Sequence, residues 1–311
     1  MDRRKPGQSD VGTTRREEDK IRILSGVFEG KTTGTPISLM IENKDRKSSD
    51  YSKIKDLYRP GHADLSFDLK YGFRDYRGGG RSSGRETATR VMAGAIAKKY
   101  LLKINKTTIV GHSVQIGSVK SARFNAKEIE KNTVRCADKS AAGEMEQYIL
   151  DIKNLGDSVG GIVEFIVKNP PAGLGEPVFD KLQADLAKAL FSIGTVKGVE
   201  FGKGFEVATM KGSENNDPLT KINKKISTST NNAGGIFGGI SIGTDIVIRV
   251  AVKPASSILK TQKTINKHGI PAKISVEGRH DACIVPRFIP VAESMIAIVL
   301  MDHYLRQKAV L

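Results

Sequence analysis

The chain has 311 residues, which is long enough to bury a substantial core as one large domain or as two. Its 50 Lys and Arg exceed its 34 Asp and Glu, and the formal net charge of +16 indicates anionic partners: nucleic acid, an anionic membrane or phosphorylated metabolites. The charge is spread without long basic blocks, and Trp is absent, which disfavours a basic nucleic-acid tail and a stacking platform for single strands. No linker divides the chain, so we expect a single domain over residues 1–311.

Cysteine usage and hydropathy limit the compartment and the kind of site. Cys136 and Cys283 are far apart and lack the spacing of metal ligands, which predicts no metal site and fits a reducing cytoplasm. The N-terminus has no apolar segment of the signal-peptide kind, and the longest apolar run, residues 296–301, is too short to span a bilayer. We therefore expect a soluble, cytoplasmic protein with no membrane partner.

Hydrophobic periodicity predicts strands and helices in alternation. Residues 21–28 and 37–41 are typical of two strands joined by a hairpin rich in Gly and Thr. The clearest amphipathic helix has apolar residues at every fourth position: Val178, Leu182, Leu186 and Leu190. Further helices are predicted over 85–102, 137–155 and 291–305, and further strands over 108–116, 161–167, 195–201 and 245–252. Residues 211–233 are polar and predict a long loop, disordered or folded over a site. This local pattern alone favours an ordinary α/β layer.

Residues 59–90 concentrate the chemistry of the chain. They contain six arginines, one histidine and three consecutive glycines at 78–80. Glycine adopts backbone angles that other residues resist, so the run can bring bare N–H groups to an anion at the start of a helix. The apolar positions of that helix are Met92, Ile96 and Tyr100. Guanidinium matches phosphate and carboxylate oxygens two at a time, so several anionic groups are expected near five arginines: Arg59, Arg74, Arg77, Arg81 and Arg85. The alternative is a plain loop on a solvated surface.

The histidines differ in how strongly their surroundings indicate a function. His62 follows Arg59-Pro60-Gly61, a turn that would hold an imidazole beside arginines, where it could give a proton to a departing phosphate; a structural histidine is the alternative. His280 and Asp281 could form an acid/base pair, but adjacent residues of an extended segment point apart, so only one should face a given site. The strand end 253–257 could hold a phosphate or be an ordinary polar turn. The remaining histidines are expected to be structural or exposed: His112, His268 and His303.

Several of these segments, taken in order, resemble the chorismate synthase family almost from end to end. The matching segments are RPGHAD at 59–64, YGFRDYRGGGRSSGRET at 71–87, PAGLGEPVFDKLQADLAKAL at 171–190, KGVEFGKGF at 197–205, NNAGGIFGGIS at 231–241, KPASS at 253–257 and GRHDAC at 278–283. The resemblance implies an α+β fold, a β-α-β sandwich with helices between two antiparallel sheets. It also implies conversion of 5-enolpyruvylshikimate 3-phosphate into chorismate and phosphate by an anti-1,4-elimination in the shikimate pathway, with reduced FMN required but no net redox change.

The resemblance also implies roles for individual residues. His62 would protonate the leaving phosphate, and Asp281 would act at the flavin N5, where the flavin assists removal of the C6 hydrogen. Three arginines would lie near the substrate: Arg4, Arg59 and Arg85. Contact with FMN is implied for Arg81, Ser82, Ser83, Gly194, Thr195, Gly238, Lys253, Pro254, Ala255, Ser256, Ser257 and Arg279. The family usually assembles as a homotetramer.

Two departures from the family pattern shape the remaining expectations. Family members begin with a further segment that contains Gly-Glu-Ser-His-Gly, which is not found in this chain. We expect an N-terminal truncation, a misassigned start or a decayed copy. We also expect little or no turnover, because the histidine of that motif is implied to be a general acid and losing a general acid lowers the rate about a hundredfold or more. Asp10 stands where many members carry an arginine, so NADPH is expected only as an indirect reductant and a separate flavin reductase is expected. The alternatives are an inactive FMN-binding relative and, more remotely, a basic nucleic-acid-binding protein.

Overall fold

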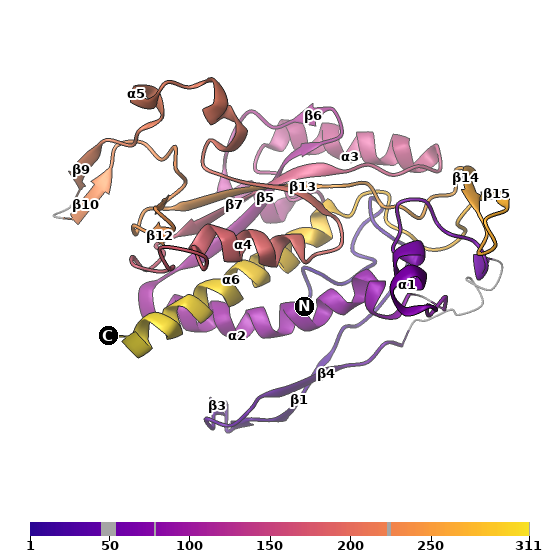
Figure 1. The fold of residues 1–311 in the computed structure, drawn as a ribbon, viewed down its shortest axis with the longest axis horizontal. Coiled ribbons are helices and arrows are strands. Elements are labelled where there is room, and N and C mark those ends of the chain that lie inside the picture. The colour runs from indigo at the N-terminus through magenta and orange to yellow at the C-terminus, as the bar shows by residue number, and fades with distance from the viewer. Residues whose placement is uncertain (45–53, 78, 223–224, 311) are drawn as a thin grey trace.

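A five-stranded antiparallel sheet forms the centre of the molecule (Figure 1). The computed structural model describes residues 1–44, 54–77, 79–222 and 225–310, so Gly78, the first of the three glycines, lies outside the described residues. The strand order is β6-β5-β7-β13-β8, and every neighbouring pair is antiparallel. The strands are β5 (Thr108–Ile116), β6 (Val119–Lys120), β7 (Gly161–Lys168), β8 (Val196–Phe201) and β13 (Ile246–Val252).

Three helices cover one face of this sheet: α2 (Thr87–Asn105), α4 (Leu182–Phe191) and α6 (Val285–Val310). Side chains alternate along a strand, and β13 accordingly buries every second residue beginning with Ile246. Phe165 of β7 packs edge-on against Phe288 of α6, with 6.2 Å between the ring centroids. The apolar face of the sheet and the helix layer therefore share one core, while α3 (Lys139–Asn154) lies beside β5 and β6.

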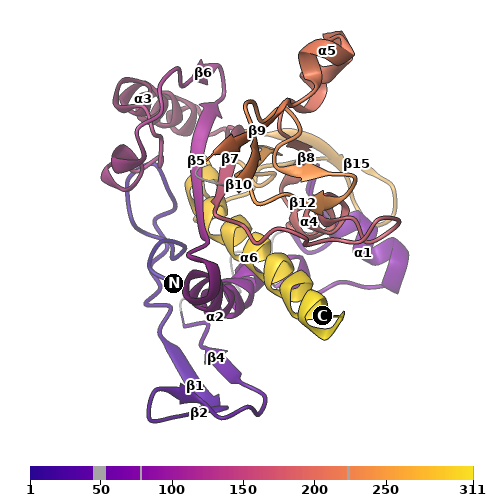
Figure 2. The ribbon, with the colours of Figure 1, turned by 90° about the vertical axis from the view of Figure 1, so that its left-hand side faces the viewer.

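A second, smaller sheet lies on the other side of the helix layer (Figures 1 and 2). It pairs β1 (Ile21–Ser25) with β4 (Ser38–Ile41), and the connection between them includes β2 (Val27–Phe28) and β3 (Lys31–Thr32). Helices thus lie between two antiparallel sheets, and the expected α+β sandwich is confirmed. The α/β layer favoured by local pattern is wrong, because β13 lies between β7 and β8 and runs antiparallel to both.

The predicted helices and strands form, with two errors about which side chains they bury. In α2 the buried residues include Val91, Ala97 and Leu101, whereas Ile96 and Tyr100 are 41% and 39% exposed. In α4 the three leucines are buried as predicted, but the helix begins at Leu182 and Val178 is 65% exposed. The first error has a packing cause. Because α2 crosses α6 closely at Gly94, the face of α2 that carries small side chains is the one directed inward.

The polar segment 211–233 contains regular structure, so the prediction of a structureless loop is wrong. It contains α5 (Gly212–Asn215) and the hairpin of β9 (Leu219–Ile222) with β10 (Lys225–Thr228). Asp217 closes the segment by accepting hydrogen bonds from the backbone N–H groups of Asn232 and Ala233. Short-range polar bonds of this kind replace the apolar burial that the sequence pattern lacks.

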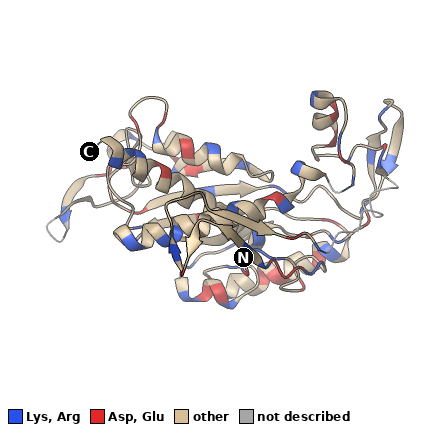
Figure 3. Ribbon diagram, turned by 90° about the horizontal axis from the view of Figure 1, so that it is seen from below, with Lys and Arg blue, Asp and Glu red and all other residues tan. Residues whose placement is uncertain are grey.

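The remaining helices, strands and 3-10 turns are all short. They are α1 (Asp64–Tyr71), β11 (Ile236–Phe237), β12 (Ile240–Ser241), β14 (Gln262–Ile265), β15 (Pro271–Ile274) and the 3-10 turns Gly80–Ser82, Gly84–Glu86, Ala126–Lys131 and Gly204–Thr209. By length and composition α6 could cross a membrane, but 61% of its most apolar window is buried inside the protein. Its Glu293 and His303 are buried and paired, so α6 is the central helix of the core. Figure 3 shows Lys and Arg positions (blue) dispersed along the ribbon, with Asp and Glu positions (red) among them.

Candidate active site

A buried carboxylate holds the turn that carries His62. Asp64 is 4% exposed and accepts hydrogen bonds from Arg59 through the backbone N–H at 3.1 Å, Nε at 2.8 Å and Nη2 at 2.7 Å. His62 Nδ1 lies 3.0 Å from Asp64 Oδ1 and 3.1 Å from Arg59 Nη2. Burial would raise the pKa of Asp64, but hydrogen bonds from Arg59 and His62 hold that pKa well below its ordinary value. The imidazole is thus fixed against an ionised carboxylate, with 20% of its side chain still exposed.

The end of β13 supports the same turn from a distant part of the sequence. Lys253 Nζ and Ser256 Oγ both donate to the Gly61 carbonyl oxygen, at 2.6 Å and 2.8 Å, and Lys253 Nζ also donates to Ser256 Oγ at 2.9 Å. Burial lowers the pKa of Lys253, and the charge of Lys197 acts in the same direction. The structure therefore brings the turn that carries the predicted histidine into contact with the predicted phosphate-holding segment, through Gly61.

The glycine turn lies next to this histidine. Gly79 and Gly80 have φ angles of 83° and 47°, in the region that favours glycine. A Cβ on Gly79 would lie 3.9 Å from His62 Cε1 and 2.7 Å from Ser82 Oγ, so the predicted seat 81–83 adjoins the ring. Ser83 Oγ accepts the Arg85 backbone N–H at 3.3 Å, and α2 begins soon afterwards at Thr87. The expected sequence of glycine turn, hydroxyls and helix start is present.

Two of the predicted substrate arginines share one buried carboxylate. Arg4 Nη1 lies 3.2 Å from Asp19 Oδ2, and Arg85 forms a short ion pair with the other oxygen of Asp19. Arg4 Nη2 also donates to the Gly84 carbonyl oxygen at 3.1 Å. Burial, with the charge of Arg287 next, lowers the pKa of Arg4 to about 10, although Asp19 opposes this. Arg4, Arg85 and Arg287 are thus near one another, and Arg85 Nη2 also lies 3.8 Å from Glu17 Oε2.

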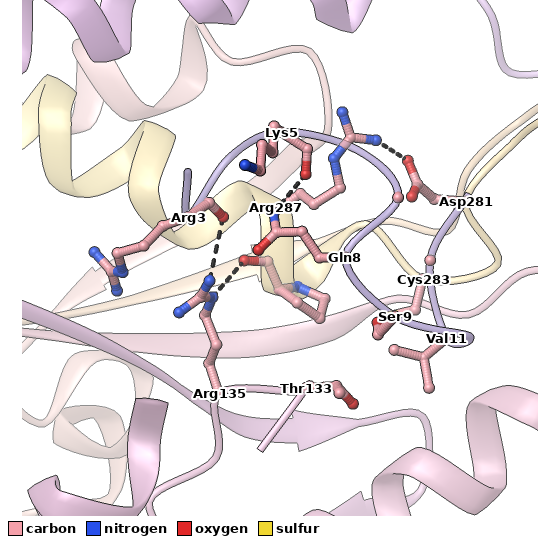
Figure 4. A pocket seen from close by; sticks show the side chains of 13 residues that line it. Arg3, Lys5, Gln8, Ser9, Val11, Thr133, Arg135, Asp281, Cys283 and Arg287 are labelled. Atoms are coloured by element: carbon pink, nitrogen blue, oxygen red, sulfur yellow. Dashed lines mark hydrogen bonds and ion pairs between the residues drawn. The ribbon is translucent and has the colours of Figure 1, made fainter. Parts of the chain in front are cut away.

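Asp281 joins this cluster from the other side. Its Oδ1 accepts the Thr13 backbone N–H at 3.0 Å, and its Oδ2 pairs with Arg287, whose Nε donates to the Arg4 carbonyl oxygen at 3.2 Å. Thr13 Oγ1 also donates to the Arg279 carbonyl oxygen at 2.6 Å. Figure 4 shows Asp281 and Arg287 lining a small pocket closed by the N-terminal segment 3–12 and by Arg135.

His280 and Asp281 have different neighbours, as their adjacency in an extended segment predicts. Burial lowers the pKa of His280 most, the charges of Arg59 and His62 lower it further, and the charge of Asp281 opposes them. Asp281 itself contacts the N-terminal segment and Arg287. Among the other histidines, His112 and His303 are buried and His268 is exposed.

The residues implied for cofactor binding divide between the two ends of β13. The Thr195 carbonyl oxygen accepts the Lys253 backbone N–H at 2.9 Å, so residues 194–195 join the His62 end. Gly238 belongs to the β11–β12 hairpin, where Gly235 packs against the Asp245 backbone just before β13 begins. The seven residues of β13 extend about 24 Å, at roughly 3.4 Å each. The structure thus brings most of the predicted residues together, but it does not bring Gly238 to them.

The donors at the His62 end fit a phosphorylated, hydrogen-bonding cofactor such as FMN. Thr195 Oγ1 and His280 Nε2 are buried, and neither has a hydrogen-bond partner among the described residues. A Cβ on Gly194 would have open space around it. Unsatisfied buried polar atoms are costly, and they are expected where a ligand supplies the missing partner.

The comparisons with known proteins agree with this geometry. A family model described as chorismate synthase matches residues 1–305. The chain belongs to the chorismate synthase family. It is 53% identical to a chorismate synthase of Chloroflexus aggregans over 99% of this chain and 85% of that protein, and 54% identical to one of Methanosarcina acetivorans over 98% and 85%. A crystal structure of chorismate synthase superposes with a TM-score of 0.73 at 32% identity, covering 92% of this chain and 78% of that one.

Family membership confirms the predicted function class, a chorismate synthase lyase of the shikimate pathway. The alternatives of an inactive relative and of a nucleic-acid-binding protein are not favoured. Sequence reasoning missed Asp64, Thr13 and Arg287 as parts of the site. A His-x-Asp spacing was the available signal for Asp64, whereas the other two are brought in only by tertiary packing.

Proposed function

We propose that this chain forms chorismate from 5-enolpyruvylshikimate 3-phosphate by eliminating the 3-phosphate together with a C6 hydrogen. The observation that carries the proposal is the contact of the His62 turn with Lys253 and Ser256 through Gly61. This contact supports the proposal because an imidazole, cationic groups and hydroxyls then lie at one end of the sheet. Elimination of a phosphate requires that combination, because the leaving group gains charge as the C–O bond breaks.

His62 is the proposed acid that protonates the departing phosphate. Its Nδ1 is engaged by Asp64, which leaves Nε2 as the nitrogen that can reach a substrate oxygen. Arg59, only 7% exposed, holds the turn rigid through three hydrogen bonds to Asp64. A rigid donor is effective because the geometry for proton transfer is already set before the substrate arrives.

Arg4 and Arg85 are proposed to hold substrate carboxylates. Both guanidinium groups lie at Asp19 near the start of α2, and Arg287 adds a third positive charge. Asp281 is the proposed second proton-handling residue, since its carboxylate is oriented by Thr13 and Arg287 on the same side of the site. The neighbourhood therefore combines binding of anions with a carboxylate that accepts hydrogen bonds.

Reduced FMN is the proposed cofactor, and it supplies the electron density that assists loss of the poorly acidic C6 hydrogen. The residues that would hold it here gather around the glycine turn and the end of β13: Arg81, Ser82, Ser83, Gly194, Thr195, Lys253, Pro254, Ala255, Ser256, Ser257 and Arg279. Cationic and hydroxyl groups among them suit its phosphate and ribityl oxygens. We propose that a separate flavin reductase supplies it, with NADPH acting only indirectly.

We also propose a cytoplasmic homotetramer. Support for self-association comes from large apolar side chains that a single copy leaves exposed, including Phe28 at 69%, Leu219 at 72% and Ile226 at 80%. Gly238 would touch a flavin bound at the His62 end only if a second copy supplied its hairpin. The free, buried Cys136 and Cys283 suit a reducing compartment.

Anaerobic turnover tests the proposal. With chemically reduced FMN and 5-enolpyruvylshikimate 3-phosphate, we expect chorismate and phosphate in equal amounts, formed at a low rate, and neither product with oxidised FMN. Binding of reduced FMN and of substrate, followed by fluorescence, is measured in parallel. Phosphate release without chorismate, or absence of both turnover and ligand binding, would contradict the proposal.

A further inference from the structure

We propose that Asp64 is a positioning residue that fixes the ring tautomer of His62, so that the Nε2 proton is the one delivered to the substrate. This inference rests on the proposed function, in which His62 is the acid. Asp64 acts only through His62, because its carboxylate faces the turn and the ring.

His62 Nδ1 has two possible hydrogen-bond arrangements, an N–H that donates to Asp64 or a lone pair that accepts from Arg59 Nη2, and the groups around it favour the first. His62 Nδ1 is 3.0 Å from Asp64 Oδ1 and 3.1 Å from Arg59 Nη2. A guanidinium can only donate, so it cannot receive a hydrogen bond from the ring, whereas a carboxylate can only accept. The single group that can accept an Nδ1–H here is Asp64. Because an ionised carboxylate is a much stronger acceptor than an imidazole lone pair, the proton stays on Nδ1.

Asp64 keeps its charge because cations surround it. Its carboxylate is 5% exposed, accepts bonds from Arg59 at both oxygens, and has Arg74 Nε 3.7 Å from Oδ1. The charge of the His62 ring also acts on His280, whose pKa is lowered mainly by burial and further by the charges of Arg59 and His62, with the charge of Asp281 opposing them. Asp64 is thus the only anion that these described contacts place against the ring.

The consequence for the reaction is a defined proton path. As the C–O bond breaks, its electron pair goes to the phosphate oxygen, and that oxygen takes the Nε2 proton of the His62 imidazolium. The product imidazole retains its Nδ1 proton in the hydrogen bond to Asp64 Oδ1. No second proton shift is needed within the ring, and the negative charge of Asp64 balances the imidazolium before the transfer.

The direct test is nitrogen NMR of the histidine side chains in the full chain. His62 is assigned by the signal that disappears in His62→Gln. At a pH where the ring is neutral, we expect the Nδ1–H form in the wild type. In Asp64→Asn we expect a mixture with substantial Nε2–H. A wild-type ring in the Nε2–H form, or a tautomer unchanged in Asp64→Asn, overturns the inference.

Asp68→Asn is the matched control, because Asp68 lies one turn further along α1 and pairs with Arg74 Nη1 at 2.6 Å without touching the ring. In this variant we expect the His62 ring to have the same tautomer as in the wild type. We expect kcat to fall about 10- to 100-fold in Asp64→Asn with little change in KM, and less than about twofold in Asp68→Asn. Equal losses in both variants would reduce Asp64 to a structural anchor and overturn the inference.

Two further measurements keep the result interpretable. If Asp64→Asn does not fold, Asp64→Glu retains a carboxylate and should restore the Nδ1–H form with an intermediate kcat; an Nε2–H ring in that variant would contradict the inference. Turnover that survives His62→Ala would overturn the proposed role of His62, whereas the tautomer measurement reports on Asp64 by itself. Failure of the two ideas can therefore be distinguished.

Discussion

Two buried carboxylates, Asp64 and Glu293, show how the same physical chemistry can have a local and a global use. Asp64 is 4% exposed and Glu293 is 1% exposed, and each has a pKa that burial would raise but that cationic partners hold below its ordinary value. The partners of Asp64 lie close by, with Arg59 and His62 on the preceding turn. Glu293 instead binds groups from several separate elements, and we infer that it organises the core.

The contacts of Glu293 connect four parts of the chain. From its place in α6 it pairs with Arg3 Nη1 at 2.5 Å and with Lys98 Nζ of α2 at 2.6 Å, and it accepts the Gly111 backbone N–H of β5 at 3.1 Å. Arg3 precedes Arg4, so this anchor also fixes the segment that enters the candidate site. The difference between the two regions predicts that Asp64 variants lose chemistry first, whereas Glu293 variants lose stability first.

The largest expected stability effect is that of Glu293→Gln. The variant leaves Arg3 and Lys98, whose side chains are 36% and 32% exposed, beside a neutral amide, and removing the buried partner of such ion pairs costs up to about 3–5 kcal/mol. Urea unfolding would measure this loss. As a control, Glu206→Gln removes an exposed pair with Lys203 and should leave the free energy of unfolding nearly unchanged. Equal effects would mean that Glu293 does not organise the core.

A smaller loss is expected from Gly94→Ala, which tests how tightly α2 and α6 cross beside Lys98 and Glu293. The added Cβ would lie 2.3 Å from Ser294 Cβ, so the helices must separate, at a cost of about 1–3 kcal/mol. Gly143→Ala in α3 is the matched control, because nothing lies within 4 Å of its Cβ and it should be neutral or stabilising by up to about 1 kcal/mol. A neutral Gly94→Ala would show a looser crossing.

The smallest effect is a pH dependence that sharpens the comparison further. Because the pKa of Glu293 is lower in the folded protein than in the unfolded chain, its contribution is complete above the unfolded pKa and is lost as pH falls through the folded one. The gap in melting temperature between wild type and Glu293→Gln should therefore narrow as the pH is lowered from 6 towards 3. A gap that widens on acidification would mean that the pKa of Glu293 is higher in the folded protein than in the unfolded chain, which contradicts the prediction.

Sequence periodicity predicts the buried side chains of a helix best where large apolar residues occupy a single face of it. Leu182, Leu186 and Leu190 are all fully buried in α4, as their spacing predicts. In α2 the same reasoning selected Ile96 and fails, because close approach to Ser294 requires Gly94 on the inner face. The buried role of Glu293 was also missed, although a lone acid in an apolar helix is a usable signal for a paired charge.

The candidate site was predictable in its residue types but not in its assembly. The histidine, the arginines and the 253–257 turn were identified from local chemistry or from the family resemblance. The turn that carries His62 meets the 253–257 segment at the Gly61 carbonyl oxygen, which accepts a hydrogen bond from Lys253, 192 residues away, and no local pattern encodes that contact. Gly238 illustrates the converse, since resemblance groups it with the site while β13 holds it at the opposite end.

The most direct test of the account is the anaerobic turnover of His62→Ala beside His268→Ala, an exposed histidine in the β14–β15 connection. With reduced FMN and 5-enolpyruvylshikimate 3-phosphate, we predict that His62→Ala loses at least about a hundredfold in kcat while it still binds both ligands. His268→Ala should match the wild type. Wild-type turnover by His62→Ala would contradict the claim that His62 is the acid of the elimination.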